Sequence, residues 1–107
     1  MKGYIYLICD NANNLYKIGV TKGKIENRLK KLQTGNATEL FLSSYYETDY
    51  PFRMETMLHN HFNAKNVLNE WFDLSIEDVV NFRKICKIIE ERIEILKVNP
   101  FFVKNLR

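Results

Sequence analysis

A chain of 107 residues is long enough for one hydrophobic core and too short for a second, so we expect a single domain over residues 1–107. Hydrophobic residues at 46% and charged residues at 27% are typical of an ordinary soluble globular protein, and a net charge of +3 permits contact with a polyanion without requiring it. No apolar run approaches the ~20 residues of a membrane span, and Cys9 and Cys86 match neither a zinc nor a CxxC pattern, which predicts no membrane contact, reduced thiols and an intracellular (cytoplasmic or nuclear) location.

Residues 3–21, GYIYLICDNANNLYKIGVT, have the pattern of an antiparallel β-hairpin. Two runs rich in β-branched and aromatic residues flank a turn-forming cluster of Asp and Asn. With the turn centred near Ala12, we expect Tyr6 to lie opposite Lys17. Strand alternation then separates an apolar face from a mixed face that packing alone would not select. The apolar face would hold Ile5, Leu7, Ile18 and Val20, and the mixed face Tyr4, Tyr6, Lys17 and Gly19.

The next two elements are predicted to be a helix and a strand. Residues 25–34 have apolar positions at helical spacing, and Arg28 falls on the same stripe as the leucines. A guanidinium on the side of a helix that faces a sheet is costly unless something anionic meets it. Residues 40–47 are rich in aromatic and apolar residues and are expected to form the third strand.

A second helix is expected from the N-cap Asp49, with Pro51 in its first turn, to about Phe62. Glu55 and His59 are one turn apart and border its apolar stripe. Both side chains are therefore expected to point at the sheet edge and toward one another.

The rest of the chain predicts a loop, a short extended segment and one long helix. Residues 63–69 are expected to be the loop, and residues 70–74, which include Trp71 and Phe72, a short strand or extended segment. A capping box of Ser75 and Asp78 would open a helix over residues 76–97, which lies across the apolar face of the sheet. The tail PFFVKNLR is expected to dock by its phenylalanines. The predicted fold is α+β: a small three-stranded antiparallel sheet with helices packed against it, in a core of about residues 3–75, plus a long C-terminal helix and tail over about 76–107.

Four strings in this sequence resemble a known family. GYIYLI followed by LYKIGVT is similar to the two strands of the GIY-YIG nuclease superfamily. The likeness is closer to its small phage and large-virus branch, which is related to a domain of meiotically up-regulated proteins. YKIGVT, RLKKLQTGN, METMLHNHF and EWFDLS occur in the order of that branch, and the resemblance covers about residues 3–75.

The resemblance implies an endonuclease that hydrolyses phosphodiester bonds in DNA with water and one divalent metal ion, Mg²⁺ or Mn²⁺. Tyr6 would take the proton from the water, Arg28 would bind the scissile phosphate, and Glu55 would be the sole protein carboxylate on the metal. These residue types suit the reaction, since it needs a base, positive charge beside the phosphate and a cation bound by oxygen. Mg²⁺ commonly accepts only one or two carboxylates.

Two positions depart from the superfamily pattern. Lys17 replaces the tyrosine of YIG, where it either assists catalysis by lowering the pKa of Tyr6 from ~10 or marks a loss of turnover. The late Asn of the superfamily has two candidates, Asn69 and Glu70. His59 joins the predicted catalytic set through a phosphate contact or proton relay, with a bond to a backbone carbonyl as the alternative.

Each candidate also has a purely structural interpretation. Tyr6 would be a half-buried strand aromatic, Lys17 a solvated strand lysine, and Arg28 and Glu55 partners in a salt bridge.

A basic group of side chains is expected beside Arg28. It forms either a track for backbone phosphates or a solvated helix face. No zinc finger or helix-turn-helix is recognisable, so a nuclease acting alone would have low sequence specificity or prefer a DNA structure. The predicted nucleic-acid-binding residues are Lys22, Lys24, Lys30 and Lys31.

Three functions are therefore open at the level of sequence. The first is the metal-dependent endonuclease, with DNA and a homodimer or specificity partner as its expected partners. The second is a catalytically inactive nucleic-acid-binding module on the same scaffold. The third is a protein-interaction domain whose long helix and PFFVKNLR tail form a dimer or dock a partner.

Overall fold

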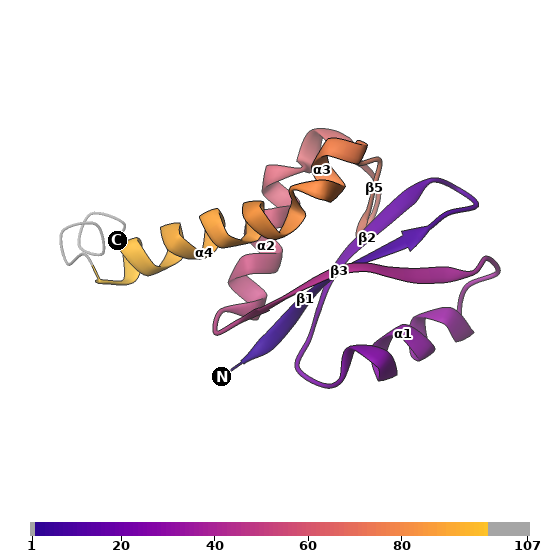
Figure 1. The fold of residues 1–107 in the computed structure, drawn as a ribbon, viewed down its shortest axis with the longest axis horizontal. Coiled ribbons are helices and arrows are strands. Elements are labelled where there is room, and N and C mark those ends of the chain that lie inside the picture. Colours follow the sequence, from indigo (N-terminus) through magenta and orange to yellow (C-terminus); the bar gives the residue numbers. More distant parts are fainter. Residues whose placement is uncertain (1, 99–107) are drawn as a thin grey trace.

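A computed structural model of the chain describes residues 2–98 and has an α+β architecture in which helices cover both faces of an antiparallel sheet (Figure 1). The sheet has five strands in the order β3-β1-β2-β5-β4. In chain order the elements are β1 (Gly3–Asp10), β2 (Leu15–Thr21), α1 (Ile25–Thr34), β3 (Leu40–Thr48), α2 (Pro51–His61), a 3₁₀ turn η1 (Asn63–Lys65), β4 (Asn66–Leu68), β5 (Trp71–Phe72), α3 (Ile76–Val80) and α4 (Phe82–Val98).

The α+β class is as predicted, but the prediction of three strands is wrong. β4 and β5 form a small hairpin that extends the sheet beside β2. The segment 63–69, expected to be a loop, contains η1 and β4. β5 lies within the segment 70–74, expected to be a short strand or extended, whereas the three residues of β4 are too few to display an alternating pattern.

The β1–β2 hairpin is paired two residues away from the predicted register. Tyr6 pairs with Gly19, and Lys17 lies opposite Ile8. The turn comprises residues 11–14, and the carboxylate of Asp10 accepts hydrogen bonds from the backbone N–H and side-chain amide of Asn13, at 3.3 and 2.8 Å. A shift of two residues leaves every side chain on its predicted face, since strand alternation has a period of two.

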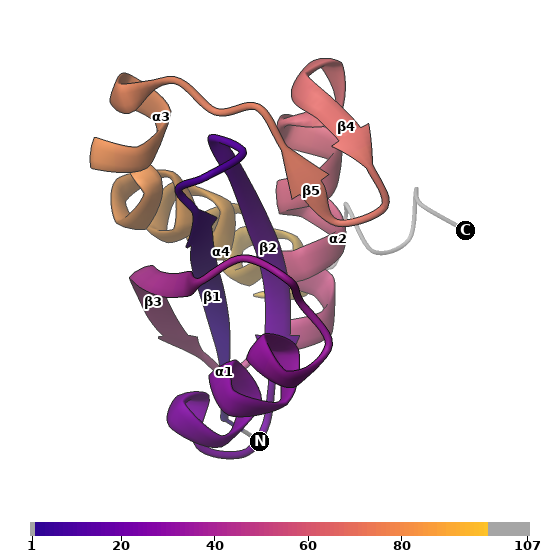
Figure 2. The same cartoon turned by 90° about the vertical axis from the view of Figure 1, so that its right-hand side faces the viewer.

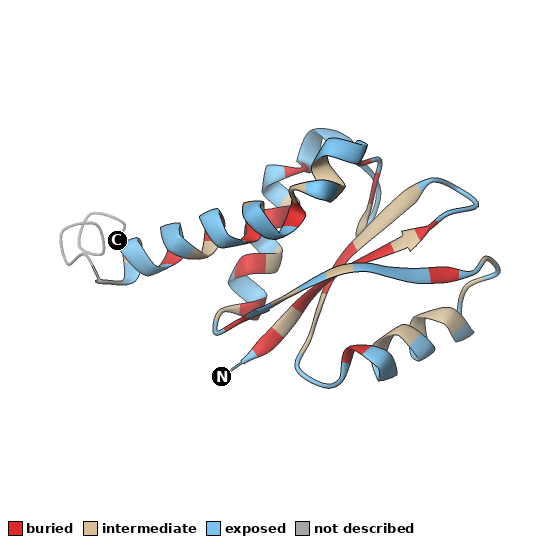
Figure 3. Cartoon of the chain, viewed as in Figure 1, coloured by how far each residue is buried: buried red, intermediate tan, exposed pale blue. Residues whose placement is uncertain are grey.

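The two faces of the sheet carry separate cores (Figure 2). On the apolar face, α2 and α4 pack on the strands, and the position of α4 is as predicted. Figure 3 shows buried residues on the central strands and at intervals along α4. The buried cluster of this face includes Ile5, Leu7, Ile18, Met54, Leu58, Phe82, Cys86, Ile89 and Ile93. On the mixed face, α1 and Trp71 cover Tyr6, Ile8 and Leu40.

The predicted long C-terminal helix is divided in two at Asn81. The capping box is present, because the Ser75 hydroxyl accepts from the N–H of Asp78 and the Asp78 carboxylate accepts from the N–H of Ser75. α3 nevertheless ends after five residues. Asn is a poor interior helix residue because its side chain competes for backbone hydrogen bonds, and α4 begins afresh at Phe82.

The start of α2 also differs from prediction. Its N-cap is Tyr50, without a side-chain cap, and Asp49 is exposed. The buried hydroxyl of Thr48 instead accepts from the N–H of Tyr50 at 3.1 Å, and Pro51 occupies the first turn as expected. The predicted docking of the PFFVKNLR tail lies outside the described residues. Between residues 2 and 98, no helix is long and apolar enough to span a membrane.

Candidate active site

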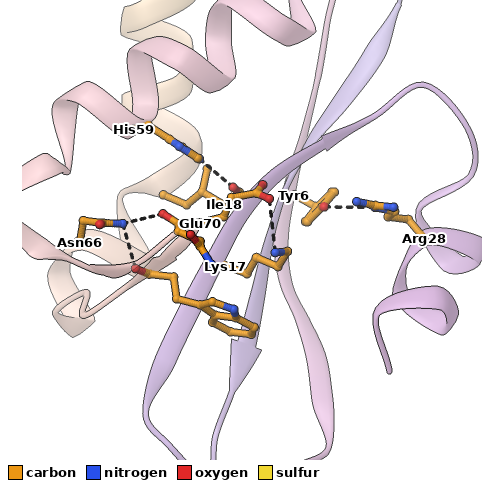
Figure 4. A network of polar contacts seen from close by, with 9 residues as sticks. Tyr6, Lys17, Ile18, Arg28, His59, Asn66 and Glu70 are labelled. Atoms are coloured by element: carbon orange, nitrogen blue, oxygen red, sulfur yellow. Dashed lines mark hydrogen bonds and ion pairs between the residues drawn. The ribbon is translucent and has the colours of Figure 1, made fainter. Parts of the chain in front are cut away.

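The candidate site lies along the edge of β2, beside the point where β5 begins. β5 pairs with β2 at Tyr16 and Lys17, and the following residue of β2, Ile18, is bonded by residues outside β5. The N–H of Ile18 donates to the carbonyl of Glu70 at 3.1 Å, and its own carbonyl lies 2.8 Å from His59 Nε2. The β4–β5 turn and α2 therefore meet at this edge (Figure 4).

Tyr6 and Arg28 form the part of the site that lies beneath α1. The Tyr6 side chain is fully buried, and its hydroxyl lies directly over Gly19, where an added Cβ would come within 2.3 Å of the oxygen. Arg28 Nε donates to this hydroxyl at 3.3 Å. The sheet-facing guanidinium thus meets a phenol oxygen, and Gly19 is required because the ring occupies the space of a side chain.

The electrostatics of Tyr6 favour its protonated form. Burial raises the pKa of Tyr6 above its ordinary value of 10, and the hydrogen bond and charge of Arg28 oppose that rise without cancelling it. Tyr6 is therefore a neutral phenol at neutral pH when the site holds no ligand.

Two carboxylates, from α2 and from the β4–β5 turn, form the second part of the site. Glu55 comes from α2 and Glu70 from the β4–β5 turn. One carboxylate oxygen of each and one ring nitrogen of His59 all lie within 4.8 Å of one another. Burial first, and the negative charge of Glu70 second, raise the pKa of Glu55. Carboxylate oxygens are the ligands that Mg²⁺ and Mn²⁺ prefer, and a cation would relieve the repulsion between them. The donor set therefore fits a divalent ion.

Lys17 is tied to the carboxylate side of the site. Its ammonium group lies 3.5 Å from the Glu70 carboxylate and 5.5 Å from the centre of the Trp71 ring, and only 12% of its side chain is exposed. The interpretation of Lys17 as a solvated strand lysine is therefore wrong. The cation that touches Tyr6 is Arg28, because Lys17 is paired with Ile8 and not with Tyr6.

His59 makes the structural contact that the sequence left open as an alternative. A carbonyl oxygen only accepts, so Nε2 carries the hydrogen that bonds to Ile18 and has no lone pair for a metal. Nδ1 is then the only ring nitrogen able to accept. An edge-on contact with Phe72, with centroids 5.1 Å apart, also orients the ring.

Asn69 and Glu70, the two candidates for the late polar residue, have different positions. Asn69 is exposed and adopts φ 51°, a left-handed conformation that Asn tolerates, so it serves the turn between β4 and β5. Glu70 directs its side chain toward Lys17 and Glu55. No periodicity or charge pattern in the sequence separates the two, because only the turn geometry decides which one enters the site.

The four predicted DNA-binding lysines are all exposed, and three of them line hollows beside the site. The cationic hollow, about 460 Å³, is bounded by Lys24, Asn27, Arg28 and Lys31 among others. The aromatic hollow, about 430 Å³, is bounded by Tyr4, Leu42 and Tyr45 on the sheet and by Lys22, Lys24 and Glu26 among others. Lys30 lines neither of these two hollows.

Comparisons with known proteins are consistent with this geometry. Neither the curated proteins nor the solved structures searched include a significant match to the chain. Residues 3–87, which contain all the candidate site residues, match the T5orf172 domain. The chain therefore belongs to the T5orf172 domain family, a nuclease-related family of phage and other proteins that is grouped with the GIY-YIG proteins.

Proposed function

We propose that this protein is a metal-dependent GIY-YIG endonuclease that hydrolyses phosphodiester bonds in DNA with low or structure-based specificity. The observation that carries the proposal is the convergence at one sheet edge of a phenol–guanidinium pair, Tyr6 and Arg28, with two carboxylates, Glu55 and Glu70. Membership of a nuclease-related family supports it. Base, phosphate-binding cation and metal ligands are the parts that this hydrolysis requires.

Arg28 binds the scissile phosphate in this proposal. Its guanidinium reaches the Tyr6 hydroxyl, and its side chain also bounds the cationic hollow with Lys24 and Lys31. A phosphate in that hollow would therefore meet Arg28 at the end nearest the catalytic phenol. A fixed guanidinium at this place stabilises the negative charge that builds up on the phosphate during attack.

Tyr6 receives the proton of the attacking water. To do so, the buried phenol must first lose its own proton to solvent, and burial opposes this loss by raising the pKa of Tyr6. Arg28 donates to the hydroxyl and lowers the pKa of Tyr6, so in this proposal it stays beside the phenol while it binds the phosphate. A divalent ion held by Glu55 and Glu70 would supply further positive charge when bound.

Glu55 and Glu70 would hold the divalent ion, which supplies charge stabilisation at the phosphate oxygens when bound. Lys17 acts as a positioning residue, because its ammonium group holds the Glu70 carboxylate from one side. His59 positions α2 against β2 through the carbonyl of Ile18. Glu55 is the carboxylate we expect to be indispensable, since it comes from the rigid helix.

Cleavage assays on supercoiled plasmid, branched DNA and single strands in Mg²⁺ or Mn²⁺ test the proposal. Glu55→Gln and Tyr6→Phe keep side-chain size and are expected to abolish cleavage while circular dichroism shows an intact fold. Lys30→Ala is the control, because Lys30 lies outside both hollows. Full activity of purified Glu55→Gln protein would refute the mechanism.

The second candidate function is a nucleic-acid-binding module without turnover. The complete burial of Tyr6 favours it, since burial raises the pKa of the phenol and makes it a poor base. This candidate predicts salt-sensitive DNA or RNA binding and no cleavage with any metal.

A further inference from the structure

We propose that the aromatic hollow is a binding pocket for one unpaired nucleobase, whose phosphate lies in the adjoining cationic hollow. The inference rests on the proposed function and deepens it by naming the substrate class: DNA with a single-stranded or displaced nucleotide beside the cleavage point. The aromatic hollow is lined by Tyr4, Leu42 and Tyr45 from the sheet and by residues of the segment that leads into α1, which are Lys22, Gly23, Lys24, Ile25 and Glu26. Its volume, about 430 Å³, is within the range of small-ligand sites.

A β-bulge builds the sheet side of this pocket. Leu42 pairs with Ile8, whereas Tyr45 pairs with Tyr6, and the register of β1 and β3 shifts between these pairs. In a regular strand, residues three apart point to opposite faces. The extra residue, Ser43, brings Leu42 and Tyr45 to the same face of the sheet, and bulges commonly re-aim side chains beside functional sites.

Tyr45 is the residue best placed to stack on a base. Its side chain is 45% exposed although it lies on the same sheet face as buried Tyr6. Arg83 lies over the ring, 5.7 Å from its centre, and Tyr4 makes an edge contact with centroids 6.2 Å apart. These neighbours hold the orientation of the Tyr45 ring. An ordered and exposed aromatic ring beside cations is the usual platform for a nucleobase.

The two hollows are positioned to bind one nucleotide. Gly23 and Lys24 belong to the walls of both, so the aromatic and cationic hollows adjoin at this loop. A base on Tyr45 would place its phosphate toward Lys24 and Arg28. Bases in a duplex are paired and stacked on their neighbours, so only an unpaired or extruded base can enter. Stacking tolerates every base, which is consistent with structure-based rather than sequence-based specificity.

Fluorescence anisotropy without divalent metal tests the pocket independently of cleavage. The probes are a labelled oligothymidylate and a fully paired duplex of the same length. Tyr45→Ala is expected to weaken binding to the single strand about 5- to 10-fold, the effect of losing one base–aromatic stack on a partly exposed ring. Duplex binding should change by less than about twofold, since phosphate contacts dominate it.

Two further variants make the test specific. Tyr45→Phe keeps the ring and should bind the single strand like the wild type. Phe41→Ala removes a ring of similar exposure, 48%, from the same strand; Phe41 pairs with Cys9 and lies outside the hollow, so binding should not change.

The results that overturn the pocket differ from those that overturn the nuclease. Unchanged single-strand binding by Tyr45→Ala, an equal loss on both DNA forms, or a Tyr45→Phe defect as large as that of Tyr45→Ala would each refute base stacking. DNA cleavage by the wild type with no Tyr45 effect on binding leaves the proposed function standing. Tyr45-dependent single-strand binding without cleavage leaves the pocket standing and refutes the nuclease.

Discussion

Gly19→Ala should destabilise the protein far more than a single methyl group normally does. An added Cβ would lie 2.3 Å from the hydroxyl oxygen of Tyr6, 2.4 Å from Cζ and 2.7 Å from Cε1. These distances are much shorter than the ~3.5–4.0 Å separation at which carbon atoms attract. The Tyr6 ring has little room to move aside, because its side chain is fully buried with Ile8 and Leu40.

The expected cost follows from two contributions. Forcing extra atoms into a packed core costs about 1–3 kcal/mol. Displacing the Tyr6 hydroxyl from Arg28 removes a hydrogen bond with a charged donor, which contributes about 1.5–3 kcal/mol in favourable cases and less for a long bond such as this one at 3.3 Å. We therefore expect Gly19→Ala to lower the free energy of unfolding by about 2–4 kcal/mol.

Urea unfolding followed by the fluorescence of Trp71 measures this loss. Gly35→Ala is the matched control, because its Cβ would meet nothing nearer than the Leu32 carbonyl at 3.9 Å and Gly35 has no positive φ. The control should stay within about 0.5 kcal/mol of the wild type. In a double-mutant cycle, Tyr6→Leu should cost less in the Gly19→Ala background than alone, since the clash is relieved. Wild-type stability of Gly19→Ala would show that the Tyr6 ring does not lie over β2.

Three further changes probe other parts of the protein. Glu70→Gln removes a negative charge that raises the pKa of Glu55, so NMR titration should find that pKa lower. A carboxyl whose pKa is raised in the folded state contributes stability that is lost as the pH rises through that pKa. The free energy of unfolding of Glu70→Gln should therefore fall less than that of the wild type as Glu55 titrates. An unchanged Glu55 pKa would contradict the proximity of the two carboxylates. Lys31→Ala should reduce the slope of the logarithm of the DNA-binding constant against the logarithm of salt concentration by about one, and Lys30→Ala should reduce it less. Equal slopes for these two variants would argue against a phosphate in the cationic hollow. Ser75→Ala removes the cap of α3 and should cost about 0.5–2 kcal/mol in chemical unfolding, and no loss would mean that the cap is dispensable.

Local features of the chain were predictable because short-range chemistry determines them. The helix predicted over residues 25–34 is α1 with the same bounds, and the capping box of Ser75 and Asp78 has both of its hydrogen bonds. The division of the hairpin into two faces is also as predicted, although its register is not. Alternation is a property of each strand, whereas the register depends on how the turn satisfies Asp10.

The candidate site was only partly predictable. Its parts from long, patterned elements were identified: Tyr6 from a strand, and Arg28 and Glu55 from helices. Glu70 was left undecided between two neighbours, because its place depends on a two-strand hairpin that has no sequence pattern. Lys17 was expected to act on Tyr6, but it contacts Glu70 and Trp71.

The sequence by itself determined the α+β class, the polarity of the sheet faces and a family resemblance at the level of the nuclease-related group, since composition, periodicity and motif order are properties of the chain alone. Only the tertiary structure decided which charges meet. It added β4, joined β5 to β2, placed Glu70 beside Glu55, and buried the Tyr6 phenol under Arg28 over Gly19. The physical reason is that contacts between distant segments depend on turn lengths and strand register, and a shift of two residues preserves the pattern while it changes every partner.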